Sequence, residues 1–134
     1  MFQGILKLLF CIAVLFITSC SQDSDDADLA QAIVGTYFIT SAESSSSIYE
    51  PTIGDEMIVT KVDNTHIDLF INFSSDLVTD IALDNILISE TSTNDYDLDK
   101  EFSNAILVGS SNESTIKVRV DYTNEDFIDF NGEK

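Results

Sequence analysis

The sequence predicts an all-β domain, for three reasons. From Ile33 onward apolar residues recur at every second position, β-branched and aromatic residues are frequent, and turn residues recur at intervals of about ten. The clearest case is Thr115–Tyr122, where every second side chain is apolar and the others are polar or charged. About eight short antiparallel strands are expected, a number that closes into a small barrel or pairs into a sandwich.

The first half of the domain supplies one helical turn and three strands. Residues 28–33 predict a single turn, with Asp28 as its N-cap and Gly35 just past its end. The run of four serines predicts a long soft loop over Ser41–Pro51. The strands expected here are 33–40, 56–62 and 66–73, the last two joined as a hairpin by Asp63-Asn64-Thr65.

The second half continues the same pattern. A strand from Leu77 to Leu83 leads through Asp84-Asn85 into residues 86–89, and this pair predicts a bulge or tight turn because both residues tolerate unusual backbone angles. Residues 95–101 fit an exposed strand edge, with Tyr96 and Leu98 inward and carboxylates in water. The remaining strands are 102–108, 115–122 and 127–130, and the turn dipeptide Asn131-Gly132 follows the last one.

The N-terminus predicts secretion. Residues 1–19 combine Lys7, an apolar run over 8–17 that is too short to cross a bilayer, and small residues before Cys20. Ile17-Thr18-Ser19-Cys20 resembles a bacterial lipobox, which implies that Cys20 becomes a lipidated mature N-terminus. Several acyl chains would make that anchor effectively permanent. Because the only other cysteine leaves with the signal, no thiol would remain for a disulfide, a zinc site or a nucleophile. The alternative is ordinary cleavage nearby that leaves Cys20 a free thiol.

Charge then limits the partners. The chain has 134 residues, enough for one domain, with 24 acidic and 6 basic side chains and a net charge of −18. Such a surface repels phosphate backbones and anionic headgroups, so nucleic acid is not expected as a partner. Residues 20–31 are expected to be the lipidated cysteine and an acidic tether. The stretch 21–28 resembles the outward sorting signal of surface-exported lipoproteins of the Bacteroidota; a plain spacer is the alternative. Localisation in a bacterial cell envelope follows, at the outer membrane and exposed on the surface.

Several short motifs, in order, resemble the calycin-like β-barrel domain of Bacteroidota lipoproteins. They are Gly35-Thr36-Tyr37, residues 58–64, Asn72-Phe73, residues 80–86 and residues 130–134. The resemblance spans roughly residues 33–134. It implies that residues 32–134 form a small meander barrel similar to a lipocalin, with a cup for a small apolar ligand. It also implies that Arg119 stacks on Tyr37, which stands where the family has Trp, and closes one barrel end. Alternatively, Arg119 points outward beside Lys117.

Other candidate chemistry is weak. A triad of His66, Ser74 or Ser75, and Asp68 has no nucleophile-elbow motif to support it, and a solvent-facing His66 is favoured. The calcium-like spacing in 95–101 fails, because Lys100 stands at the glycine position and Ile106 at the bidentate glutamate position. A looser acidic cluster remains a candidate for calcium: Asp121, Glu125, Asp126 and Asp129.

We therefore expect no catalytic residues, no metal and no cofactor. The leading hypothesis is a lipid-anchored envelope protein that touches the membrane through its lipid and whose barrel binds a small apolar ligand or another envelope protein. The second is a structural or accessory lipoprotein whose barrel is filled. The third is a hydrolase built on acidic residues, which would need two facing carboxylates about 5 to 10 Å apart in an open cup.

Overall fold

The computed structural model describes residues 27–75 and 79–134. The signal sequence, Cys20 and most of the acidic tether lie outside these residues, as does Leu77, where one strand was expected to begin. Within the described part of the chain, no helix has the length and apolar character needed to span a bilayer.

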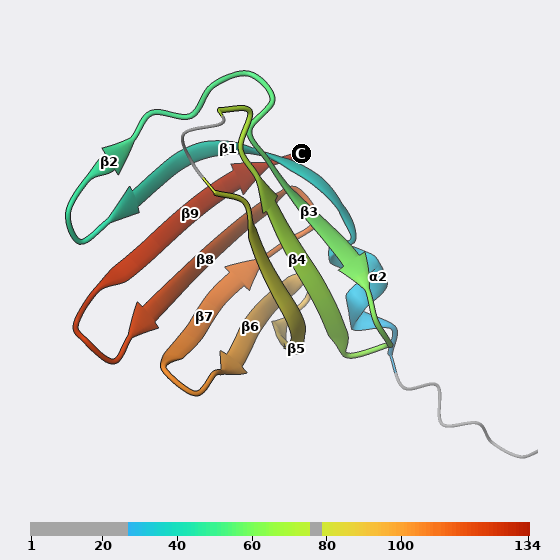
Figure 1. The fold of residues 1–134 in the computed structure, drawn as a ribbon. Helices are drawn as coiled ribbons and strands as arrows, with labels where there is room; N and C mark the ends of the chain where they lie inside the picture. The colour runs from blue at the N-terminus through green and yellow to red at the C-terminus, as the bar shows by residue number, and fades with distance from the viewer. Residues whose placement is uncertain (1–26, 76–78) are drawn as a thin grey trace, which may run out of the picture.

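The described residues form a closed antiparallel barrel of eight strands (Figure 1). Its strands are β1 (Gly35–Ser44), β3 (Glu56–Lys61), β4 (His66–Asn72), β5 (Ile81–Ser92), β6 (Asp95–Glu101), β7 (Ala105–Ser111), β8 (Thr115–Tyr122) and β9 (Phe127–Glu133). Each pairs with its neighbour in the chain, and β1 closes the ring by pairing with β9. A ninth strand, β2 (Ile48–Tyr49), lies outside the ring, and within residues 27–75 and 79–134 it pairs with β1 alone. The predicted all-β meander barrel is confirmed.

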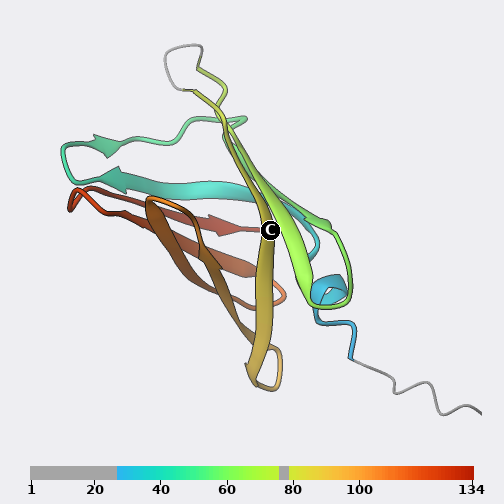
Figure 2. The same ribbon diagram turned by 60° about the horizontal axis from the view of Figure 1, so that its bottom comes forward.

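A short helix, α2 (Leu29–Ile33), lies at one end of the barrel beside the β3–β4 turn (Figure 2). Asp28 caps it by accepting a hydrogen bond from the Gln31 amide, as predicted. The helix buries Ala30 and Ile33 completely, and the Ala30 amide donates to the Asn64 carbonyl. We call this the closed end.

The barrel interior is filled with side chains. The largest that are fully buried come from every strand of the ring except β9 and from α2: Ile33, Tyr37, Met57, Val59, Ile67, Leu69, Ile71, Ile86, Ile88, Leu98, Leu107 and Ile116. From β9, Phe130 is 2% exposed and joins the same cluster. The period-two alternation therefore directs its apolar side chains inward, and the centre of the barrel is a packed core rather than an open cup.

Two predicted local features are confirmed. The hairpin through Asp63-Asn64-Thr65 joins β3 and β4. The Asp84-Asn85 pair forms a bulge in β5, because two steps along β4 are matched by three along β5 at this point. Asn85 has a φ of 55°, and its amide donates to the Asp68 carboxylate at 2.7 Å, so the bulge has its own hydrogen-bond partner.

Three predictions about strand boundaries are wrong. The expected loop over 41–51 is largely the β1–β2 hairpin, whose tight turn is held by Ser44 Oγ accepting from the Ser46 and Ser47 amides. Strand β6 is paired on both sides and is no edge. The strand expected at 102–108 starts three residues later, because Phe102 lies in the preceding turn.

The Asn131-Gly132 dipeptide is also not a turn. Gly132 lies within β9, opposite Ile39 on one side and Ile116 on the other. A Cβ added at Gly132 would stand 2.5 Å from Met57 Cε and 3.1 Å from Tyr37 Cβ. Glycine is therefore present to admit close packing of its neighbours rather than to reverse the chain.

Candidate functional site

The end of the barrel opposite α2 carries a pocket. Strand β4 begins at the closed end with His66 and ends at this mouth with Asn72, and the β1–β2 hairpin and the β8–β9 turn lie at the same end (Figures 1 and 2). The pocket has a volume of about 210 Å³ and opens to solvent. Its lining residues are Ala42, Glu43, Ser44, Ser47, Tyr49, Phe73, Ile81, Ile128 and Phe130.

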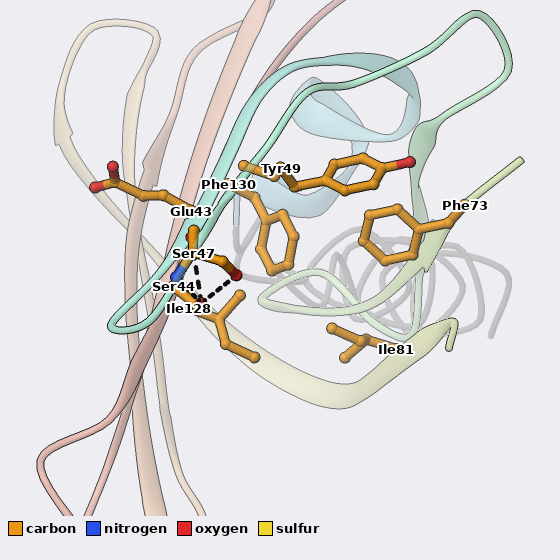
Figure 3. Close-up of a pocket in the computed structure, with 9 residues that line it drawn as sticks. Glu43, Ser44, Ser47, Tyr49, Phe73, Ile81, Ile128 and Phe130 are labelled. Carbon is orange, nitrogen blue, oxygen red and sulfur yellow. Dashed lines mark hydrogen bonds between the residues drawn. The ribbon is translucent and has the colours of Figure 1, made fainter. Parts of the chain in front are cut away.

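A bulge in β1 directs side chains into this pocket. Between Ile39 and Ser41 the register with β9 slips by one residue, so Ile39 and Ala42 both face inward although they are three positions apart. Ala42 is therefore buried in the pocket wall, whereas Glu43 points away from the rings (Figure 3). The pocket floor and sides are consequently apolar, and its charged group stands at the rim.

Three aromatic rings form the main wall. The Tyr49 and Phe73 rings meet edge to face at 5.3 Å between centroids, and Phe73 lies 6.1 Å from Phe130 at a tilt of 49° (Figure 3). Ile81 and Ile128 lie near the other side of the space, and both are half-buried. This arrangement can hold an apolar group against ring faces and edges.

A buried carboxylate holds two sides of the mouth together. Asp55 is 1% exposed and accepts five hydrogen bonds. They come from the Tyr49 hydroxyl at 2.9 Å, from the Thr52 amide and hydroxyl, and from the Ser74 amide and hydroxyl. Tyr49 lines the pocket and Ser74 follows Phe73, so this carboxylate fixes the distance between the Tyr49 and Phe73 rings.

The same contacts set the charge state of Asp55. Burial raises the pKa of this carboxyl, but the hydrogen bonds from Thr52, Ser74 and Tyr49 outweigh burial and hold the pKa well below its usual range. Asp55 is therefore ionised at neutral pH. Sequence reasoning did not single it out, because β3 and β4 separate Tyr49 and Thr52 from Ser74 along the chain and no motif links these donors.

The predicted stacking of Arg119 on Tyr37 is wrong. Tyr37 is fully buried inside the barrel, whereas Arg119 alternates with the buried Val118 and Val120 and so points outward. The guanidinium stacks on the Phe127 ring at 4.1 Å, and its Nε donates to Asp121 at 2.8 Å.

The cation over the Tyr37 ring is Lys134, with Nζ 4.9 Å from the ring centroid, and the Tyr37 hydroxyl donates to the Ile33 carbonyl. Lys134, β1 and α2 therefore meet at the closed end, and Lys134 rather than Arg119 is the cation over the Tyr37 ring.

The residues of the hypothetical triad are not brought together. His66 begins β4 at the closed end, half-buried, with Nδ1 3.0 Å from the Asp63 carboxylate. Ser74 lies beyond the other end of β4, bonded to Asp55, and Asp68 accepts from the Asn85 amide. Strand β4 covers about 20 Å from His66 to Asn72, and Ser74 lies two residues further on.

The acidic candidates are also dispersed. Asp121 and Asp129 flank Arg119, at 2.8 and 3.9 Å, whereas Asp126 accepts from the Ser45 and Asn124 side chains. Over residues 27–75 and 79–134, no three side chains of the metal-binding types come together in a way that could hold an ion.

Comparison with known proteins identifies the fold and no family. No protein-family model matches the chain, and no curated protein matches it. A solved structure from Bacteroides fragilis, that of a "putative outer membrane protein", is similar with a TM-score of 0.61 and 13% sequence identity. The alignment covers 80% of this chain and 53% of that one, so the chain spans about half the length of the protein it matches. The small antiparallel barrel is thus also found in a longer protein.

Proposed function

We propose that this protein is a lipid-anchored, non-catalytic cell-envelope protein whose barrel binds a small apolar group in its mouth. The observation that carries the proposal is the solvent-open apolar pocket, walled by three aromatic rings and two isoleucines, at the end of an otherwise filled barrel. The lipobox at Ile17–Cys20, the calycin-like motifs and the similarity to a protein named for the outer membrane support the envelope location.

The size of the pocket limits the ligand. Pockets for drug-sized molecules usually have about 300 to 1,000 Å³, whereas an apolar cavity of about 150 Å³ takes one benzene ring. At about 210 Å³, the mouth fits one ring or one branched aliphatic group. The ligand is then either a very small molecule or, more in keeping with an open pocket, the apolar end of something larger.

The outer face of β6 supports a location of the barrel in water, with the tether joining it to the membrane. Membrane-spanning barrels place apolar side chains outward and polar ones inward. On β6 the alternation is reversed: the carboxylates of Asp97 and Asp99 are exposed, while Tyr96 and Leu98 are buried inside. Contact with the membrane is therefore assigned to the lipid on Cys20.

The filled interior specifically favours a second candidate function, that of a structural or accessory lipoprotein without a ligand. Ile67, Leu69 and Leu107 are at most 1% exposed, so the barrel centre is packed where calycins would hold a ligand. The two candidates differ in one property, which is whether the mouth pocket takes up an apolar molecule.

Toluene titration followed by isoleucine methyl NMR tests this. We expect saturable shifts of the Ile81 and Ile128 methyls, and none of Ile53, which is fully exposed, or Ile116, which is buried within the barrel. Ala42→Leu, which fills the pocket, should weaken binding at least tenfold.

The matched control is Thr36→Leu, on the outer face of the same strand, which should leave binding unchanged. Native mass spectrometry of protein purified from its own envelope then identifies the natural ligand. Toluene that shifts no lining methyl would leave the structural role as the better account.

A further inference from the structure

Strand β2 has one free edge beside the pocket. It pairs with β1 on one side, and among the residues that the structure describes no strand pairs with its other side. Both ribbon views show β2 standing off from β3 and β4 (Figures 1 and 2). An unpaired strand edge offers backbone donors and acceptors to another chain.

The hairpin register shows which backbone groups are offered. The Ser44 amide donates to the Ser47 carbonyl at 2.8 Å, so these two residues form a hydrogen-bonded pair. Antiparallel pairs alternate, which makes Glu43 and Ile48 a non-hydrogen-bonded pair. The amide and carbonyl of Ile48 therefore point to the free edge. Its side chain is 80% exposed, and the next residue, Tyr49, lines the pocket.

Edge and pocket are thus adjacent. A strand laid along β2 would pass Tyr49 at the mouth and could lower one side chain into a space that fits one ring or branched aliphatic group. Because β2 has only two residues, backbone pairing alone would be weak, and the inserted side chain would supply the rest.

The charge of the surrounding surface distinguishes between the partners that could bind along this edge. None of the nine lining residues is cationic, and Glu43, Glu50 and Asp126 are exposed acids of the β1–β2 and β8–β9 region. A second copy of this chain would bring another 18 net negative charges to that surface, and anionic lipid would be repelled as well. A cationic segment is the complementary occupant.

We infer that the mouth binds an extended, cationic peptide segment of another protein, paired through its backbone with Ile48 and inserting one aromatic or aliphatic side chain into the pocket. This inference rests on the proposed function, since it names the source of the apolar group. Association is fast and salt-sensitive, because the charges stand at the rim rather than in the pocket.

The probe is a capped seven-residue peptide with a central Phe, Val and Thr at alternate positions, and Lys near each end. We expect it to shift the Ile81 and Ile128 methyls and the backbone amides of Ile48 and Glu50. A peptide with Glu in place of Lys, and one N-methylated at alternate backbone positions, should each bind at least tenfold more weakly. Raising the salt concentration should weaken binding of the Lys peptide and leave toluene binding unaffected.

The matched protein variants are Ile48→Pro and Ile48→Val. Proline is tolerated on edge strands and removes only the outward donor, so Ile48→Pro should lose at least tenfold in peptide affinity while still binding toluene. Ile48→Val keeps the amide donor and should bind both the peptide and toluene as the wild type does.

The outcomes separate the two proposals. Toluene binding without peptide binding would overturn this inference and leave the proposed function standing, whereas failure of both would remove the proposed function too. Equal affinity for the Lys and Glu peptides, or for the methylated and unmethylated ones, would also overturn it. A dimer in sedimentation that Ile48→Pro dissociates would identify a second copy as the occupant, against this proposal.

Discussion

Replacing Asp55 by Asn should destabilise the protein substantially although it changes the side-chain volume very little. The carboxylate accepts from two backbone amides at 2.7 Å, those of Thr52 and Ser74, one on each oxygen. An asparagine has one oxygen and one NH₂ group, so one of these amides must face a donor. The hydroxyls of Tyr49 and Ser74 can rotate to adapt, but a backbone amide cannot.

The magnitude follows from these contacts. Leaving one buried donor unsatisfied costs about 1 to 3 kcal/mol, and loss of charge assistance from the remaining bonds adds about 1 kcal/mol. We therefore expect Asp55→Asn to lower the free energy of unfolding at pH 7 by about 3 kcal/mol, measured by urea denaturation followed by circular dichroism. Asp126→Asn, at an exposed carboxylate bonded to Ser45, is the control and should cost less than about 1 kcal/mol.

The pH dependence provides a second test. Hydrogen bonding depresses the pKa of Asp55 in the folded state below the value of about 3.9 that an unfolded aspartate has. Its stabilisation is therefore present above about pH 4 and is lost as the pH falls further. The gap between wild type and Asp55→Asn should narrow below about pH 4. A gap under about 0.5 kcal/mol at pH 7, or one that stays constant down to pH 2.5, would refute this reasoning.

Three further predictions concern Gly132 in β9, Tyr37 at the closed end and the lipid anchor at Cys20. Gly132→Ala should cost about 1 to 3 kcal/mol in urea unfolding, since the new methyl meets Met57 and Tyr37, and a neutral variant would contradict the assigned packing. Tyr37→Phe removes the hydroxyl that donates to the Ile33 carbonyl at 2.7 Å and should cost about 1 to 2 kcal/mol; unchanged stability would show that this bond contributes little. Cys20→Ala should abolish radiolabelled palmitate incorporation, and label that survives the substitution would remove the lipid anchor.

The parts of the fold that the sequence predicts are those with local signals. Period-two alternation locates β4 and β8 because one face of each is buried, and the bulge at Asp84-Asn85 is predicted because few residues tolerate its backbone angles. Strand β2 was missed because serine is common in loops, and nothing local shows that a serine run forms the turn of a hairpin.

The site is harder to predict because its parts meet only through the closed barrel. Asp55, Tyr49 and Ser74 carry no shared motif, and their contact depends on how the loops before β3 and after β4 pack at the mouth. The direction of Arg119 depends on the strand phase, and there the alternation favoured the outward position that the structure shows. The dipeptide Asn131-Gly132 predicts a turn, and only the neighbours of Gly132 across the sheet show that it lies within a strand.

Xenon binding in a pressurised crystal tests the central claim most directly, because xenon enters apolar space without requiring a particular ligand. The structure predicts one strong site at the mouth, between Phe73, Ile81 and Ile128, and none among the packed side chains around Leu69 and Leu107. Xenon in the barrel centre, or an empty mouth, would contradict the account of a filled barrel with a binding pocket at its open end.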